Sequence, residues 1–315
     1  MPSMWIVASL GPPLLLIGYG VFKARESWLN PALWCAFITG MIGALLAVGI
    51  EAWLGQLLGI KPELMMTANP MRAGLAGFVI AGATEETVKM IGLLLAMMLL
   101  DEKRLRSVLM IAVAVAMGFA GFENVLYVVG AGRDWQSVAL LRGGAAVPIH
   151  GVCGLMMGAI IVGTIANDFD RLAGLMLAWL VPVMLHGTYD SLLLLTAQDF
   201  APWKLPTVVV AMLLGGVMAV ALANNAILAV ASLADETDAG GPIKGFLRVL
   251  VTRAARSYLC FLFIPVAVGG FQLEAVWTAG FLAVLPTVLT GDILFARLRS
   301  PVLSRDRRWI TVREA

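Results

Sequence analysis

Four groups of polar side chains stand inside long apolar stretches of the sequence. The groups are Glu85 and Glu86 with Lys89, Glu123 with Asn124, His150 with Gly154, and His186 with Asp190. Carboxylates and imidazoles are the side chains that most often act as general bases and acids, and both bind zinc. The chain has two histidines, and both belong to these groups. The residue types therefore predict proton-transfer or metal chemistry within an apolar environment.

The composition indicates that this environment is a lipid bilayer. The chain has 315 residues, of which 60% are hydrophobic and 13% are charged, and its mean hydropathy is +0.91. A typical soluble protein is about 45–50% apolar and about 25% charged. The small net charge of +2 gives no reason to expect a nucleic acid as a partner. We therefore expect an all-α, polytopic integral membrane protein that packs against lipid.

Nine apolar runs are long enough to cross a bilayer as helices. They are residues 4–22, 32–52, 73–100, 107–129, 143–166, 172–196, 205–233, 257–271 and 274–296. With the N-terminus outside, 16 of the 22 lysines and arginines fall on the inner side and five on the outer side. This positive-inside bias predicts a multi-pass protein of the cell membrane with a cytoplasmic C-terminus. We expect one membrane domain over 1–315, with a four-helix catalytic core at 73–196 and accessory helices at 1–72 and 197–315, the last carrying a basic tail.

Charged side chains inside such spans are expected to face one another. One charge at the bilayer centre costs about 2.5–3.5 kcal/mol on insertion scales. Five of them facing lipid would cost about 12–17 kcal/mol, more than the typical net folding stability of about 5–15 kcal/mol. A spacing of four residues puts Glu85 and Lys89 on one helix face, and His186 and Asp190 on another. Glu86 points about 100° away from Glu85, so it is expected to face a different side of the helix.

The four groups are also expected at one depth. At about 1.5 Å per residue, their distances from the outer ends of the spans place them roughly 10–20 Å below the outer surface. Helices of alternating direction would thus bring them into a single layer, which unrelated structural charges would not be expected to form. A functional site is favoured over a polar network that only fastens helices together.

The cysteines predict no disulfide framework. Cys35, Cys153 and Cys260 are widely spaced, and each lies in an apolar run. All three are expected to be small apolar residues at helix contacts. Cys153 has a minor alternative as a metal neighbour because it follows His150 by three residues.

The ordered set of motifs resembles that of the PrsW-type intramembrane proteases, which share a superfamily with CAAX prenyl proteases and bacteriocin-processing enzymes. The family pattern is E-E-x-x-K, then F-x-x-x-E-N, then H-x-x-x-G, then H-x-x-x-D. All four occur here in order on successive spans, and the second begins at Phe119. The resemblance covers about residues 73–196 and leaves the other spans without a readable motif.

This resemblance implies an intramembrane endopeptidase. Its substrate would be a single-span membrane protein with a regulatory role, such as an anti-sigma factor, cut near the extracytoplasmic side. One of Glu85 and Glu86 would act as the general base, and Lys89 would be the counter-charge of the pair. Which of the two carboxylates is the base stays open at this point.

Two versions of the remaining chemistry stay open as well. In the metal-free version His150 shares in water activation, and His186, oriented by Asp190, stabilises the oxyanion together with Asn124. In the metal-dependent version His150, His186 and Glu123 hold Zn²⁺, with a fourth position open for water. The sequence has no H-E-x-x-H helix, the usual zinc-protease signature.

Other functions fit the sequence less well. An aspartyl intramembrane protease would need Asp190 and Asp292 to meet, but they lie near opposite ends of their spans, and Leu289 replaces a glycine of that motif. No G-x-S-x-G nucleophile motif is present. A proton-coupled transporter is the main alternative from another class, although the sequence shows neither inverted repeats nor broken helices. A non-catalytic scaffold of the same superfamily is the third interpretation.

Overall fold

The computed structural model describes residues 2–24, 29–60, 69–99, 105–166 and 170–196, and every regular element within them is helical. The α-helices are α1 (Pro2–Ala24), α2 (Pro31–Leu57), α3 (Pro70–Gly74), α4 (Thr84–Leu99), α5 (Leu105–Gly130), α6 (Trp135–Leu141), α7 (Val147–Ala166) and α8 (Arg171–Thr196). Two π-helical segments, η2 (Leu75–Ala83) and η4 (Arg142–Ala146), and one 3₁₀ turn, η3 (Gly132–Asp134), connect them. The predicted all-α class is thus confirmed for this part of the chain.

The first six predicted spans coincide with helical segments. Three helical stretches, Pro31–Leu57, Ser107–Gly130 and Arg171–Ser191, are long and apolar enough to cross a membrane, and Met4–Gly18 and Val147–Val162 are shorter apolar helices. The predicted spans after residue 196 lie outside the described residues. The total of nine spans and the side on which each terminus lies stay predictions.

Two of the helices begin at an Asn-Pro pair. Oδ1 of Asn30 accepts a hydrogen bond from the backbone N–H of Ala32 at 3.0 Å. Oδ1 of Asn69 accepts from Met71 and Arg72 at 2.9 and 3.3 Å. A proline at the first helical position has no N–H to leave unpaired, and the asparagine satisfies the next ones. These caps determine where α2 and α3 start.

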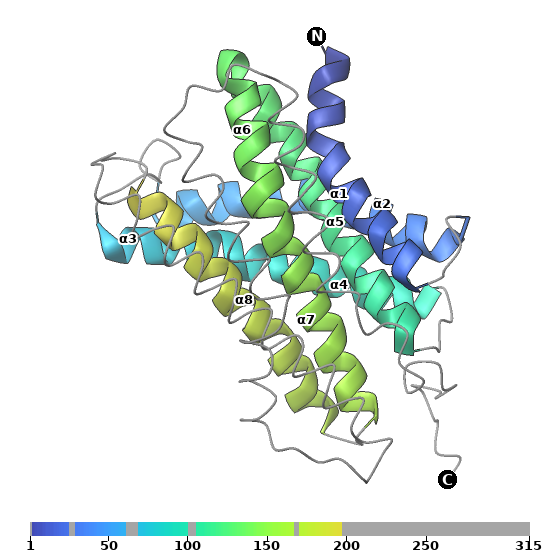
Figure 1. The fold of residues 1–315 in the computed structure, drawn as a ribbon. Coiled ribbons are helices and arrows are strands. Elements are labelled where there is room, and N and C mark those ends of the chain that lie inside the picture. Colours follow the sequence, from blue (N-terminus) through green and yellow to red (C-terminus); the bar gives the residue numbers. More distant parts are fainter. Residues whose placement is uncertain (1, 25–28, 61–68, 100–104, 167–169, 197–315) are drawn as a thin grey trace, which may run out of the picture.

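Helix α5 forms the centre of the bundle. Every residue from 107 to 121 is buried, because α1 and α2 pack against it on one side and α7 on another (Figure 1). A Cβ atom at Gly118 would collide with the backbone carbonyl of Phe37, and one at Gly40 would collide with that of Val115. Small residues at the contact therefore let α2 and α5 approach closely, which is how membrane helices gain packing energy.

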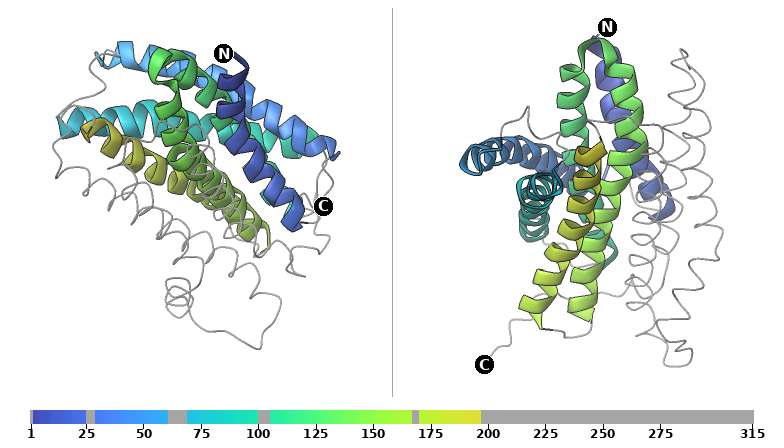
Figure 2. Two further views of the ribbon diagram at one scale, coloured as in Figure 1. Left: turned by 45° about the horizontal axis from the view of Figure 1, so that its top comes forward. Right: turned by 90° about the vertical axis from the view of Figure 1, so that its left-hand side faces the viewer.

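The helices run in two main directions. Helices α5, α7 and α8 extend along one direction, whereas α2 and the α3–η2–α4 segment run across them and are seen nearly end on in the right-hand view of Figure 2. Helix α8 packs on η2 and on α7, and α4 packs on α2 and α5. The start of α4 is thereby placed where it crosses α5, α7 and α8.

A π-helical segment precedes two of the polar groups. The segment η2 ends directly before Thr84, where α4 begins, and η4 leads into α7. Such segments change the rotational phase of the residues that follow and occur often at functional sites. They orient the first turn of α4 and the start of α7 differently from a continuous α-helix.

Candidate active site

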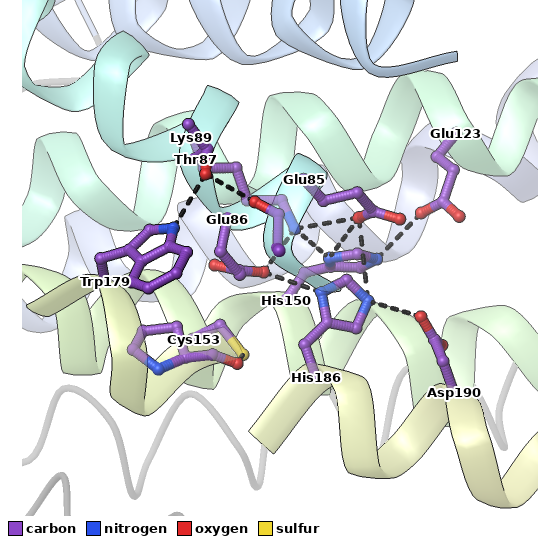
Figure 3. A network of polar contacts seen from close by, with 12 residues as sticks. Glu85, Glu86, Thr87, Lys89, Glu123, His150, Cys153, Trp179, His186 and Asp190 are labelled. Carbon is purple, nitrogen blue, oxygen red and sulfur yellow. Dashed lines mark hydrogen bonds and ion pairs between the residues drawn. The ribbon is translucent and has the colours of Figure 1, made fainter. Parts of the chain in front are cut away.

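The four polar groups meet at one place inside the bundle. Glu85, Glu86 and Lys89 come from α4, Glu123 from α5, His150 from α7, and His186 and Asp190 from α8 (Figure 3). Six of the eight predicted site residues are buried, namely Glu85, Glu86, Lys89, Asn124, His150 and His186. Glu123 and Asp190 are the least buried of the eight, with 15% and 20% of their side-chain surface exposed.

The Lys89 ammonium is the centre of the α4 group. Its Nζ atom lies 2.8 Å from Oε1 of Glu86, 3.2 Å from Oε2 of Glu85 and 2.8 Å from Nδ1 of His150. An ammonium has three N–H donors and no acceptor, so these three contacts use all of them. Nζ also lies 4.2 Å from the ring centroid of Phe119, which gives the phenylalanine of the motif a cation–π role.

His150 is held between a cation and a carboxylate. Because Lys89 only donates, Nδ1 of His150 must accept, and the ring proton is on Nε2. Nε2 lies 2.9 Å from Oε2 of Glu123 and donates to it. One turn along the helix, a Cβ atom at Gly154 would lie 2.8 Å from the carbonyl oxygen of Ala112, so this glycine lets α7 pack against the backbone of α5. The network thus assigns His150 as the neutral Nε2–H tautomer.

His186 has a different environment, with carboxylates on both sides. Nδ1 lies 2.8 Å from Oε1 of Glu86, and Nε2 lies 3.3 Å from Oδ2 of Asp190. Both nitrogens therefore face acceptors, as in an imidazolium. The His150 and His186 rings are 4.9 Å apart between centroids and nearly perpendicular, at 85°. The predicted pairing of His186 with Asp190 is present.

The two adjacent glutamates are held differently. Oε1 of Glu86 accepts from both Lys89 and His186, and the Glu86 side chain is fully buried. Oε2 of Glu85 lies 3.9 Å from Nδ1 of His150 and 3.7 Å from Nε2 of His186. These two distances exceed a direct hydrogen bond. Glu85, rather than Glu86, therefore has an oxygen between the two imidazoles.

Asn124 and Glu123 face a second cation, Arg142, at the start of η4. The Nη2 atom of Arg142 lies 2.7 Å from Oε2 of Glu123, and its Nε donates to Oδ1 of Asn124 at 2.7 Å. Nδ2 of Asn124 donates to the backbone carbonyl of Ser9 in α1 at 3.2 Å. The Asn124 amide thus joins α1, α5 and η4 through these two contacts.

Three donor atoms lie close enough together to hold a metal ion. They belong to Glu85, His150 and His186 and lie within 4.8 Å of one another. One carboxylate and two imidazoles are a common ligand set of catalytic zinc. Glu123, which the sequence indicated as the third ligand, is paired with His150 and Arg142, and Glu85 takes its place in this group.

The position of Lys89 does not fit a divalent cation in that group. Its Nζ lies 3.2 Å from Oε2 of Glu85 and 2.8 Å from Nδ1 of His150, and the second contact uses the lone pair that a metal bound at Nδ1 would need. A divalent ion about 4 Å from an ammonium is repelled by about 8 kcal/mol at an effective dielectric constant of about 20. Glu85, His150 and His186 are residue types that bind zinc, but the ammonium of Lys89 already supplies a positive charge among them.

Two features of the site were not found from the sequence. Arg142 is one of the five lysines and arginines that the predicted topology places on the outer side, although its position just before span five and eight residues before His150 is a signal. Glu51 lies near the end of α2, which packs against α4 and α5, the helices that carry Glu85 and Glu123. A carboxylate inside the second predicted span was the signal for Glu51. Cys153 is a buried packing residue as expected, with Sγ 3.8 Å from the carbonyl of Pro182, whereas Cys35 is exposed on α2.

Comparison with known proteins identifies the family. Residues 30–222, which include all the residues of the site, match the PrsW-protease family, described as "PrsW family intramembrane metalloprotease". The match covers more than half of the chain. The chain belongs to the PrsW family. It is accordingly an integral membrane protein and a membrane protease that acts on a protein substrate.

Individual PrsW proteases are similar over most of the same region. The chain is 28% identical over 196 residues to Protease PrsW of Halalkalibacterium halodurans, which is 62% of this chain and 86% of that protein. It is 27% identical over 189 residues to Protease PrsW of Shouchella clausii, covering 60% and 82% of the two chains. Protease PrsW of Clostridioides difficile is 30% identical over 156 residues, or 46% of this chain and 65% of its own length. No solved structure is significantly similar to the chain.

Proposed function

We propose that this PrsW-family chain is an intramembrane endopeptidase in which Glu85 activates the water and His186 stabilises the oxyanion. The observation that carries the proposal is the place of Oε2 of Glu85, 3.7 and 3.9 Å from nitrogens of the two imidazoles. Peptide hydrolysis requires a base beside the attacking water and donors beside the developing oxyanion. Both requirements are met within this single cluster.

Glu85 is the better candidate for the base. Its Oε2 has one direct donor, Lys89 at 3.2 Å, whereas Oε1 of Glu86 is bound by both Lys89 and His186 at 2.8 Å. A carboxylate that already accepts two short charge-assisted hydrogen bonds is a weaker proton acceptor than one held loosely. Glu86 thus acts as the anion that orients Lys89 and His186.

His186 supplies the hydrogen-bond donor for the developing oxyanion. With Glu86 at Nδ1 and Asp190 at Nε2, the ring is doubly protonated and held in one orientation. Nε2 also lies 3.7 Å from Oε2 of Glu85, and in the proposed mechanism its single N–H is shared between Asp190 and the developing oxyanion. The same nitrogen is placed to give a proton to the leaving amine, and Asp190 holds the ring in position for both steps.

Lys89 supplies the fixed positive charge that a metal would otherwise provide. The ammonium contacts both adjacent carboxylates in a buried place, where two like charges would otherwise repel. We propose that the reaction depends on glutamate and histidine, because the ammonium of Lys89 contacts Glu85 and His150, two of the three residues that could hold a metal. Zinc on Glu85, His150 and His186 would polarise the carbonyl and acidify water.

The proposed substrate is a single-span membrane protein with a regulatory role, of the anti-sigma-factor type, cut near the extracytoplasmic side. The predicted outer-half depth of the polar groups supports this side. A chain that unwinds at this depth would present its scissile peptide beside Glu123 and Asp190, the least buried residues of the cluster.

The test compares membrane proteins of cells that carry wild-type protein or one of three variants. Glu85→Gln and His186→Gln remove the proposed base and donor, and Asp134→Asn is the matched control because Asp134 is exposed in η3. We expect a single-span protein to accumulate uncut with Glu85→Gln and His186→Gln, and its new N-terminus to appear with wild type and Asp134→Asn. Identical N-termini in all four strains would refute the protease. Loss of solute uptake with normal processing would instead support the transporter.

A further inference from the structure

Arg142 is anchored by three contacts to one face of α5. Its Nη2 atom lies 2.7 Å from Oε2 of Glu123, its Nε donates to Asn124 at 2.7 Å, and its guanidinium carbon lies 4.0 Å above the ring of Tyr127. The Arg142 side chain is 13% exposed. An arginine whose fork is engaged on two sides and stacked on an aromatic ring has little freedom to bind another group. Its contacts thus point toward the site rather than toward a separate ligand.

The contact with Glu123 leads directly to a site imidazole. Oε2 of Glu123 is shared between Nη2 of Arg142 and Nε2 of His150, at 2.7 and 2.9 Å. Because a guanidinium is always charged, it keeps Glu123 as a pure acceptor. Nε2 of His150 must then donate, which leaves Nδ1 to accept from Lys89. An unbroken chain of contacts therefore runs from Arg142 through Glu123 and His150 to Lys89.

We propose that Arg142 is a positioning residue, which acts through Glu123 to hold the His150 ring in its Nε2–H tautomer. Without the guanidinium, Glu123 can share a proton with His150 or turn away, and Nδ1 is no longer reserved for Lys89. The ammonium would then lose one of its three acceptors beside Glu85. The effect of Arg142 on catalysis rests on the proposed function, whereas its effect on the His150 tautomer does not depend on that function.

The state of the His150 ring can be measured directly because the chain has two histidines. Protein labelled with ¹⁵N-histidine in lipid bilayers gives ring-nitrogen signals from two imidazoles, and a His186→Gln sample assigns those of His150. For wild type we expect one protonated and one unprotonated nitrogen in His150, with the proton on Nε2. Arg142→Gln should shift both nitrogens toward a mixture of tautomers. Arg142→Lys, which keeps a cation beside Glu123, should restore the wild-type pattern.

The matched control is Arg133→Gln, because Arg133 is exposed in η3 near the same end of the bundle. It should leave the His150 signals unchanged. Wild-type His150 signals in folded Arg142→Gln protein would overturn the proposal. If Arg142→Gln does not fold, Arg142→Lys decides, since a changed tautomer in a variant that keeps the charge contradicts the proposed role.

Activity provides a second readout, with the single-span substrate found in the cellular experiment. Arg142→Gln should lower kcat about 10- to 100-fold with little change in KM, the range expected for loss of a hydrogen bond to a charged group. In a Glu123→Gln background the same change should cost less than about twofold, because the two residues act in series. Fully additive effects of the two substitutions on kcat would show that Arg142 does not act through Glu123. Absence of cleavage by wild type would refute the proposed function and leave the NMR result to decide the role of Arg142.

Discussion

The Nζ atom of Lys89 lies 2.8 Å from Nδ1 of His150, so the ammonium of α4 is hydrogen-bonded to an imidazole of α7 as well as to the carboxylates of its own helix. This contact links the charged residues of α4 to the His150 imidazole of α7. It explains why a lysine accompanies the pair of glutamates in the first motif. It also places a permanent charge where a metal ion would compete with it.

Removing the ammonium should be more damaging than the loss of one ion pair. In Lys89→Met, Glu85 and Glu86 are left buried beside each other without their cation. Removing one partner of a buried ion pair typically costs about 3–5 kcal/mol. We expect a clearly lower thermal unfolding midpoint in detergent and no cleavage, whereas Arg133→Gln should keep the wild-type midpoint. An unchanged midpoint for Lys89→Met would show that the carboxylates do not depend on this charge.

The two adjacent glutamates should respond differently to the same change. Glu85→Gln removes the proposed base and should lower kcat by about 10²- to 10⁴-fold with a small effect on stability. Glu86→Gln weakens two short hydrogen bonds of a fully buried group and should cost about 1–3 kcal/mol of stability. Thermal unfolding and cleavage rates of both purified variants check this. The reverse pattern would assign the base to Glu86.

The metal content of the purified protein separates the two mechanisms. We expect active wild-type protein to contain less than stoichiometric zinc and to ignore chelators, because Lys89 contacts two of the three donor atoms. Lys89→Ala should raise zinc affinity, since it frees the donors of Glu85, His150 and His186. Elemental analysis and titration calorimetry provide the measurement. Stoichiometric zinc that is lost together with activity in Glu85→Gln, or in Glu123→Gln, would establish the metal version instead.

The close approach of α2 and α5 gives a prediction about stability alone. A Cβ atom at Gly118 would collide with the backbone of Phe37, whereas one at Gly49 in α2 would meet nothing within 4 Å. Gly118→Ala should therefore destabilise the protein by about 1–3 kcal/mol through overpacking. Gly49→Ala should be neutral or stabilising by up to about 1 kcal/mol, because alanine is the better helix former. Thermal unfolding of the two variants compares them directly, and equal midpoints would contradict the predicted packing.

The predicted topology places the C-terminus inside and the turn around Asp134 outside. A reporter fused after Ala315 should be active only in the cytoplasm, and one inserted near Asp134 only outside it, as the distribution of lysine and arginine requires. A C-terminal tag that reacts with antibody on intact cells would overturn the nine spans and the depth of the site.

Much of the site could be predicted because charge inside a membrane is a strong constraint. The cost of leaving Lys89 or Glu123 in lipid requires partners, and the spacing of His186 and Asp190 shows which face they share. The helical segments could be predicted for the same reason, since an apolar run of that length has few alternatives to a helix. These inferences depend on composition and spacing, which a sequence contains in full.

Other features depend on the rotation and crossing of helices, which spacing does not determine. The exchange of Glu123 for Glu85 in the group of three donors follows from how α4 crosses α7 and α8. The π-helical segment η2 alters the phase of α4 just before Glu85. Arg142 resembles an ordinary loop charge until η4 turns it onto α5. A prediction from regular helical periodicity cannot include such shifts.

The pairing of charges has a consequence for how the chain enters the membrane. Lys89 meets both its carboxylates within one turn of α4, and His186 meets Asp190 within one turn of α8. Glu123 and Arg142 belong to one helical hairpin and can meet as soon as it forms. Each insertion step can thus deliver its charges already partly neutralised, at a lower cost than isolated ions would have. The contacts of Lys89 with His150 and of Glu86 with His186 join α4 to α7 and α8, so the arrangement of the site is completed last, after the energetically difficult segments are already in the bilayer.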